Sequence, residues 1–314
     1  MRSPIVVALL AAVALVACKK SEPAKQAAPP PPPSAVDTWA SATPPPAAKP
    51  RIDKPFFFSA TKDGKTLYLL GTLHVGVDAA TQLPPWVLTK LDGARAFAME
   101  TDISDPSMVK LLVRTDGKKL SQELSPEDWT KLKATIGDAL AEGLDGMLPF
   151  ATLATLAIKD LPMTAPMDAV LLDRAKTAGK PVIYLESVQA QIDAISPFAT
   201  AADIHATLAN LEYGHTQALQ MLKDYLAGDA AALNAMFDDK TLWLAAGRDP
   251  ARFGDFIEAT LTKRNASWIA PLEQMAADGG GFVAVGAAHL VGPDNVPDSL
   301  AARGFTVKRL IAGD

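Results

Sequence analysis

The sequence almost lacks cysteine: Cys18 is the only one in 314 residues. A single thiol cannot form a disulfide within the chain, so the folded part must be held together by burial of its core. Clusters of basic residues with interleaved aromatic residues are also absent, and the net charge is −5. This acidic balance argues against nucleic acid as a partner. No short-period repeat is present.

Long apolar runs are limited to residues 5–16. This run is shorter than the roughly 20 residues that a membrane-spanning helix needs, but its length suits an export signal, and Arg2 supplies the preceding positive charge. The run ends in Leu15-Val16-Ala17-Cys18, which resembles the lipobox of bacterial lipoproteins. We predict a signal peptide over 1–17 and a lipid anchor on Cys18. The alternative is an ordinary signal peptide followed by an incidental cysteine.

Residues 18–50 are rich in proline, alanine and serine, with uninterrupted proline runs at 29–33 and 44–46. Such a segment cannot bury enough apolar surface to fold, and it favours an extended polyproline conformation. We predict a lipid-anchored linker; a ligand for a proline-binding groove is the alternative. Lys19 and Lys20 follow the cysteine, with no aspartate after it, which by resemblance to Gram-negative sorting rules favours an outer-membrane lipoprotein facing the periplasm or the cell surface.

Residues 51–314 alternate between strand-like and helix-like patterns, which predicts one α/β domain. Strands are expected at 56–60, 66–70, 95–99, 181–185, 282–285 and 305–310, the first two joined as a hairpin through Asp63-Gly64. Helices are expected at 85–93, 125–143, 153–161, 167–178, 253–277 and 297–302, with a mostly helical 199–237 interrupted near Gly214 and Gly228. The predicted architecture is a mixed central sheet with flanking helices, in which 199–277 is a helical insertion.

Four polar residues follow the ends of apolar strands: His74, Glu100, Glu186 and His289. Ligands of open α/β sheets bind beside the carboxyl ends of the strands, so these side chains are expected to converge. Both histidines end a Gly-x-x-His motif, in which Gly71 and Gly286 are expected to turn the chain off its strand. Two imidazoles with carboxylates suit a divalent transition metal such as Zn, Mn, Co or Fe.

Each of these signals has an ordinary alternative when it is taken alone. A histidine at a strand end is often a hydrogen-bonded structural residue, and a glutamate there often caps a helix. The other two histidines, His205 and His215, lie ten residues apart in a helical region and do not share a helix face. We therefore interpret His205 and His215 as surface or packing residues.

The chain resembles the TraB/GumN family, whose animal members include the Tiki proteases. The matching segments are Gly71-Thr-Leu-His74-Val-Gly76, the strand that ends in Glu100, Gly179-Lys-Pro-Val-Ile-Tyr-Leu-Glu186 with Gln191, Arg264-Asn265 before Trp268, and Val285-Gly-Ala-Ala-His-Leu-Val-Gly-Pro293. The resemblance covers residues 52–311. It implies an α/β fold like that of erythromycin esterase and haem-binding lipoproteins, and a metal-dependent protease site that uses manganese or cobalt.

These observations lead to two hypotheses. The first is a membrane-anchored, metal-dependent hydrolase, a peptidase acting on peptide or protein substrates in the periplasm, with Mn, Co or Zn bound by His74, His289 and Glu100. In that hypothesis Glu186 is the general base, although the order of the two glutamates stays open. Arg264 holds a glutamate, stabilises an oxyanion, or forms a plain helix-surface ion pair; Asn265 borders the pocket or caps a turn. The second hypothesis is a non-catalytic lipoprotein that binds a small ligand, a haem or a peptide.

Overall fold

The computed structural model describes residues 51–105 and 107–313. The predicted signal peptide, Cys18 and the proline-rich linker lie outside the described residues. Within the described part of the chain, no helix has both the length and the hydropathy needed to cross a membrane.

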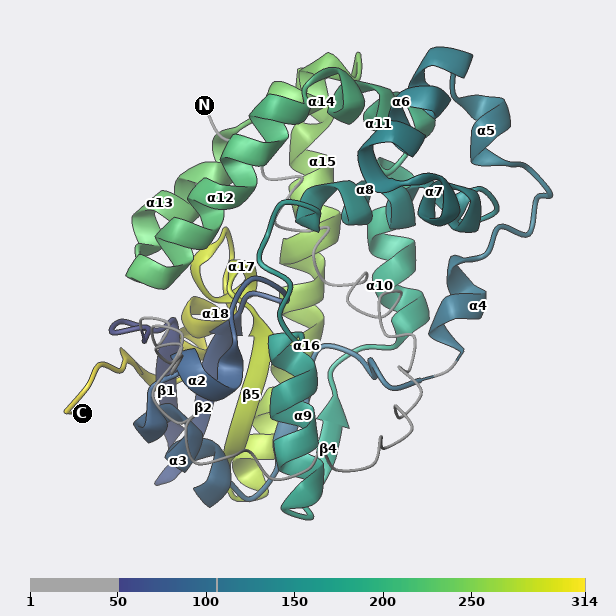
Figure 1. Cartoon of the computed structure of the whole chain (residues 1–314). Helices are drawn as coiled ribbons and strands as arrows, with labels where there is room; N and C mark the ends of the chain where they lie inside the picture. The colour runs from purple at the N-terminus through teal and green to yellow at the C-terminus, as the bar shows by residue number, and fades with distance from the viewer. Residues whose placement is uncertain (1–50, 106, 314) are drawn as a thin grey trace, which may run out of the picture.

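A six-stranded sheet forms the base of the domain, with the strand order β4-β3-β5-β2-β1-β6 (Figure 1). Its strands are β1 (Phe57–Lys62), β2 (Lys65–Thr72), β3 (Phe97–Met99), β4 (Val182–Tyr184), β5 (Gly281–Gly286) and β6 (Thr306–Arg309). Strands β4, β3, β5 and β2 are parallel, whereas β1 is antiparallel to both β2 and β6. The mixed α/β fold class predicted from the sequence is therefore confirmed.

The predicted hairpin is present, and its turn has the chemistry that a two-residue connection requires. Lys62 pairs with Lys65 across the turn, and Asp63 and Gly64 have φ values of 50° and 70°. Positive φ at both positions is characteristic of the type I′ turn, whose twist matches that of the flanking strands. Asp-Gly is among the residue pairs that adopt this turn most readily.

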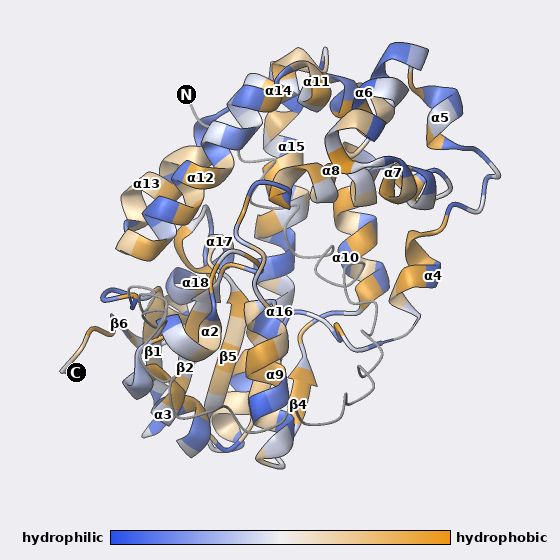
Figure 2. Cartoon of the chain, viewed as in Figure 1, coloured by the Kyte–Doolittle hydropathy of each residue, from blue (hydrophilic) through white to orange (hydrophobic). Residues whose placement is uncertain are grey.

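The sheet is buried on both faces, as strand β5 shows most directly. Phe282 and Ala284 contribute to one hydrophobic core, and Val283 and Val285 to a second core on the opposite face. This division follows from the alternation of side chains along a strand. Helices α3 (Pro85–Gly93) and α9 (Met167–Thr177) cover the first face, and α16 (Lys263–Ala277) and α18 (Val296–Ala302) the second. Strands β4 and β5 accordingly carry mainly hydrophobic colours in Figure 2.

A helical lobe stands beyond the carboxyl ends of the parallel strands (Figure 1). Between β3 and β4 the chain forms α4 (Met108–Leu112), α5 (Leu120–Glu123), α6 (Pro126–Ile136), α7 (Asp138–Leu144) and α8 (Pro149–Ile158). Between β4 and β5 it forms α10 (Val188–Ile195), η1 (Ser196–Phe198), α11 (Ala201–Ala209), α12 (Leu211–Ala227), α13 (Ala230–Ala235), η2 (Met236–Asp238), α14 (Thr241–Ala245), η3 (Pro250–Arg252) and α15 (Phe253–Ile257). Two short helices, α2 (Ala79–Gln82) and α17 (Ala288–Val291), follow β2 and β5.

The structure differs from the helix predictions in four details. The insertion is not confined to 199–277, because α4–α8 pack against it, as the contacts of α11 with α8 and α6 show. The expected helix 125–143 divides at Gly137, and Gly214 lies inside α12 without interrupting it. The expected helix 253–277 contains a π-helical segment, η4 (Glu258–Thr262), between α15 and α16. Local patterns indicate helical residues but do not show which helices pack together.

Candidate functional site

The candidate site lies where the order of the parallel strands reverses. Strand β5 is inserted between β2 and β3, so the connections from these neighbouring strands leave in different directions. A crevice at the carboxyl ends is the usual consequence in an open α/β sheet. His74 follows β2 by two residues, Glu100 comes directly after β3, and His289 lies on α17 just beyond β5.

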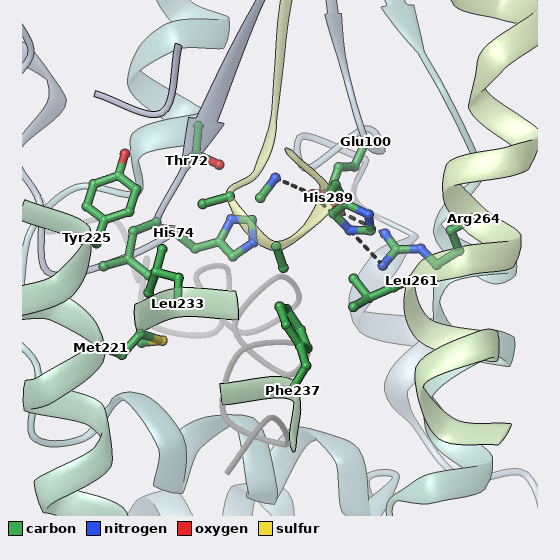
Figure 3. Close-up of a pocket in the computed structure, with 14 residues that line it drawn as sticks. Thr72, His74, Glu100, Met221, Tyr225, Leu233, Phe237, Leu261, Arg264 and His289 are labelled. Atoms are coloured by element: carbon green, nitrogen blue, oxygen red, sulfur yellow. Dashed lines mark hydrogen bonds and ion pairs between the residues drawn. The ribbon is translucent and has the colours of Figure 1, made fainter. Parts of the chain in front are cut away.

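A small cavity of about 30 Å³ occupies this crevice. It is lined by Thr72, Leu73, His74, Glu100, Met221, Tyr225, Leu233, Phe237, Leu261, Arg264, Gly286, Ala287, Ala288 and His289 (Figure 3). The structure thus brings together His74, Glu100, Arg264 and His289 from the residues selected in the sequence. Glu186 does not line the cavity, and instead contacts Arg264.

The orientation of His74 is fixed by Asp168, the second residue of α9. The Nδ1 atom of His74 is 2.5 Å from Asp168 Oδ2, and the hydroxyl of Thr72 donates to the other carboxylate oxygen over 2.9 Å. Burial favours the neutral imidazole, but the carboxylates of Asp168 and Glu100 together outweigh it and raise the pKa of His74. Because Nδ1 is bonded to Asp168, the other ring nitrogen, Nε2, points toward Gly286. It lies 3.6 Å from the position that a Cβ atom on Gly286 would occupy.

His289 is held in a corresponding way, but by a neutral partner. Its Nδ1 is 2.6 Å from Asn265 Oδ1, and the Asn265 amide nitrogen donates to the carbonyl of Asp294 over 2.9 Å. That second bond identifies the Asn265 oxygen as the acceptor, so Nδ1 carries the proton and Nε2 is the acceptor nitrogen. Burial, together with the cations of Arg264 and His74, lowers the pKa of His289 to about 3.

Arg264 joins the two glutamates that follow β3 and β4. Its Nη2 donates to Glu100 Oε2 over 2.8 Å and to Glu186 Oε1 over 2.6 Å, and its Nε also faces Glu186. Its Nη1 donates to the Thr260 carbonyl, and lies 3.2 Å from His289 Nε2. Arg264 is only 6% exposed, which excludes the helix-surface ion pair considered from the sequence.

Glu100 is the most extensively bonded carboxylate of the site. Its Oε1 accepts the backbone N–H of Gly286 over 2.7 Å, and its Oε2 accepts the Gln191 amide over 3.0 Å besides the Arg264 bond. Burial opposes ionisation of this group, but His289, Arg264, His74 and the Gly286 N–H lower its pKa to about 2. Burial instead raises the pKa of Glu186, against the effect of Arg264.

Sequence reasoning missed Asp168, because an acidic residue in the first turn of a helix has an ordinary explanation in the helix dipole. It also gave no role to Trp268, whose ring lies 4.4 Å from the His289 ring and under the Arg264 guanidinium. The two histidines interpreted as surface or packing residues do not line the cavity, and each pairs with a carboxylate: exposed His205 with Asp128, and half-buried His215 with Asp160.

The two Gly-x-x-His motifs interlock, and their glycines are needed for close approach. Neither glycine has a positive φ, so the sharp turn expected from the sequence is not their role. A Cβ on Gly71 would lie 2.9 Å from the Cα of Ala287, which follows the other motif's glycine. A Cβ on Gly286 would lie 3.2 Å from Glu100 Oε1. The missing side chains therefore leave room for the neighbouring motif and for Glu100.

We expect Gly71→Ala to lower the free energy of unfolding by about 1–3 kcal/mol, the usual cost of overpacking, because the clash is with backbone. Gly286→Ala should disturb the site more than the stability, since the closest contact is a side-chain oxygen. Gly143→Ala in α7 is the control, because nothing lies within 4 Å of its added methyl. Urea unfolding of the three variants measures the difference, and a Gly71 variant as stable as the control would contradict the overpacking explanation.

The fold and this site can be compared with known proteins. The pattern of the TraB/PrgY/gumN family matches residues 56–309. The uncharacterised protein YbaP of Escherichia coli K12 is 28% identical over 247 residues, which cover 74% of this chain and 87% of YbaP. YbaP of Shigella flexneri matches with the same figures. No solved structure matches the chain. Because the family pattern spans nearly all of the described domain and both Gly-x-x-His motifs, the chain belongs to the TraB/PrgY/gumN family.

Proposed function

We propose that this protein is a metal-dependent hydrolase of peptide bonds and that the cavity is its active site. The observation that carries the proposal is the matched pair of imidazoles. His74 and His289 follow the neighbouring strands β2 and β5, and each has its Nδ1 bonded to an oxygen acceptor. Histidines that bind metal through Nε2 are commonly oriented by such a bond on the other ring nitrogen.

The charges around the cavity also favour a cation. Three carboxyl groups, Glu100, Asp168 and Glu186, lie buried in or beside the cavity, and only two cationic partners face them, Arg264 and, when it is protonated, His74. A buried surplus of negative charge is costly unless it is compensated. A divalent ion beside Glu100 and the two histidines would provide that compensation.

The donor chemistry fits Mn, Co or Zn, which accept imidazole and carboxylate ligands. In the described residues, no three histidine, cysteine, aspartate or glutamate side chains already form a metal ligand group. His289 Nε2 instead accepts from Arg264 over 3.2 Å. We therefore propose that His74, His289 and Glu100 hold the metal, and that the contact between His289 and Arg264 is given up when it binds.

Arg264 and Glu186 have further roles in the proposed hydrolysis, in which the hydroxyl of water adds to the carbonyl carbon, the C–N bond breaks and the other proton of that water ends on the leaving amine. The metal, when bound, would act as a Lewis acid toward the carbonyl. Arg264 lines the cavity, and its guanidinium is suited to stabilising the negative charge that develops on the carbonyl oxygen. Glu186, which faces Arg264 rather than the cavity, is proposed to position that guanidinium.

The decisive experiment measures metal content and peptide cleavage in His74→Ala and His289→Ala. We expect the wild type, loaded with Mn²⁺, Co²⁺ or Zn²⁺, to hold stoichiometric metal and both variants to lose it together with activity, because alanine supplies no donor. The matched controls are His205→Ala and His215→Ala, which remove imidazoles that also pair with a carboxylate but do not line the cavity. Wild-type metal content in both site variants would refute the proposed ligands.

The apolar part of the cavity lining favours one alternative, a non-catalytic protein that binds a small ligand, a haem or a peptide. Measurements on the same purified protein distinguish the two functions. A wild-type protein that cleaves no peptide with any of the three metals, but purifies with a coloured iron–porphyrin spectrum or a tightly held organic ligand, would favour the binding function.

We also propose that the domain acts in the periplasm from a membrane anchor on Cys18. The motif Leu15-Val16-Ala17-Cys18 and the proline-rich segment after it support this proposal. Cys18→Ala is expected to abolish acylation and to leave the precursor uncleaved before residue 18. Mass spectrometry of the mature N-terminus measures both, and an unmodified Cys18 or cleavage at another position in the wild type would overturn the anchor.

A further inference from the structure

The cavity has two chemically different walls. The ends of the strands and α16 supply the polar wall, with His74, Glu100, Arg264 and His289. The helical lobe supplies an apolar wall: Met221 and Tyr225 from α12, Leu233 from α13, Phe237 from η2 and Leu261 from η4. Figure 3 shows the ring of Phe237 pointing toward the space between His74 and His289. Any group that reaches the polar wall must therefore lie beside apolar side chains.

Phe237 is separated from the main cores of the domain. Together with Leu261 and Ala288 it forms a small hydrophobic cluster that belongs to neither of the two large cores. It also packs closely against the end of α17, where a Cβ on Gly292, the residue that follows the helix, would lie 3.0 Å from its ring. Because this cluster is separate from the two large cores, we expect that the Phe237 side chain can move, or be replaced by a shorter one, without disrupting the packing of either core on the sheet.

The size of the cavity shows that a substrate must displace part of this wall. At about 30 Å³ it holds one or two water molecules and no amino-acid side chain. A polar side chain entering here would lose its hydration without gaining partners from the lobe, whereas a non-polar side chain would gain from leaving water. The chemistry of the wall thus discriminates between these two classes of side chain.

We infer that the substrate is a peptide with a non-polar side chain beside the bond that reacts, and that Phe237 sets the size of side chain accepted. This inference rests on the proposed hydrolase function. The side chain lies against Met221, Leu233 and Phe237, and the carbonyl of the reacting bond faces the histidines and Arg264. Tyr225 stays in place, because its hydroxyl donates to the Gly71 carbonyl over 2.8 Å.

The test uses end-blocked tetrapeptides that carry Leu, Phe, Asp or Lys at each position in turn, with the full chain loaded with Mn²⁺, Co²⁺ or Zn²⁺. We expect kcat/KM at one position to be at least about tenfold higher for Leu and Phe than for Asp and Lys, the scale of discrimination by a hydrophobic pocket. Phe237→Leu should shift the preference from Leu toward the larger Phe. Leu219→Ala is the matched control, because Leu219 lies on the same helix as Met221 but is exposed.

The outcomes separate this inference from the proposed function. Cleavage without preference, or with preference for Asp or Lys, would overturn the inference and leave the hydrolase intact. If no peptide is cleaved, the hydrolase proposal fails, and calorimetric titration of the same peptides then decides: selective binding of the Leu and Phe peptides supports apolar recognition, and unselective or absent binding overturns it. Circular dichroism checks that Phe237→Leu is folded, and an unchanged preference in the folded variant would remove Phe237 from the inference.

Discussion

Arg264→Met is expected to lower the free energy of unfolding by about 3–5 kcal/mol, the cost of leaving a buried ion pair with one partner missing. Arg264 is buried, and its guanidinium bonds both Glu100 and Glu186, so methionine would fill much of its volume but leave two carboxylates without their cation. Urea unfolding of the wild type and the variant measures the loss.

Two further variants test this explanation. Arg252→Met removes an exposed arginine that also pairs with a carboxylate, Asp255, and should change the free energy of unfolding by less than about 0.5 kcal/mol. The double variant Arg264→Met with Glu186→Gln should recover part of the loss, because one of the two uncompensated charges is removed. A loss of the same size in Arg264→Met and Arg252→Met would show that burial of the pairs with Glu100 and Glu186 is not what makes Arg264 important.

Glu186→Gln is expected to keep the fold and the metal and yet reduce kcat by about 10²-fold or more, the scale seen when a donor to a developing oxyanion is lost. Glutamine removes the charge that Arg264 Nε and Nη2 now share, while the three proposed metal ligands keep their contacts. Metal analysis and steady-state kinetics of the metal-loaded variant measure the two effects separately. The matched control is Glu258→Gln, which changes an exposed glutamate that pairs with the exposed Lys263.

The pH profile of kcat/KM distinguishes the positioning role from the general-base role expected from the sequence. When a general base is removed by substitution, the limb of the pH profile that reports the ionisation of that base disappears. If Glu186 only positions Arg264, the Glu186→Gln profile keeps the wild-type shape at a lower level. Loss of the acidic limb would reinstate Glu186 as the base, and loss of metal would contradict the proposed ligand set.

Local patterns were sufficient to predict the sheet and its polar strand ends. The apolar run that forms the buried strand β5 and the Asp-Gly turn between β1 and β2 depend on neighbouring residues, so they could be read from short segments. The same holds for His74, Glu100 and His289, because the end of an apolar strand is visible in the sequence and parallel strands share one edge.

The helical lobe was predicted less well, since the sequence indicates helices but not their partners. Helices α4–α8 belong to the same lobe as α11 and α12, although strand β4 separates them in the chain. The packing of non-local helices depends on the shapes of their apolar faces. Composition and periodicity within one segment do not contain that information.

The sequence by itself determined the fold class, the family and three of the polar residues that line the cavity after strands. The tertiary structure alone decided how those residues are held: Asp168 reaches His74 across 94 positions, and Arg264 reaches Glu100 across 164. It also decided that Gly71 and Gly286 serve close packing rather than turns, and that Glu186 faces Arg264 instead of the cavity. The physical reason is the same in each case, because hydrogen bonds and steric contacts between distant segments exist only once the strands and helices have been assembled.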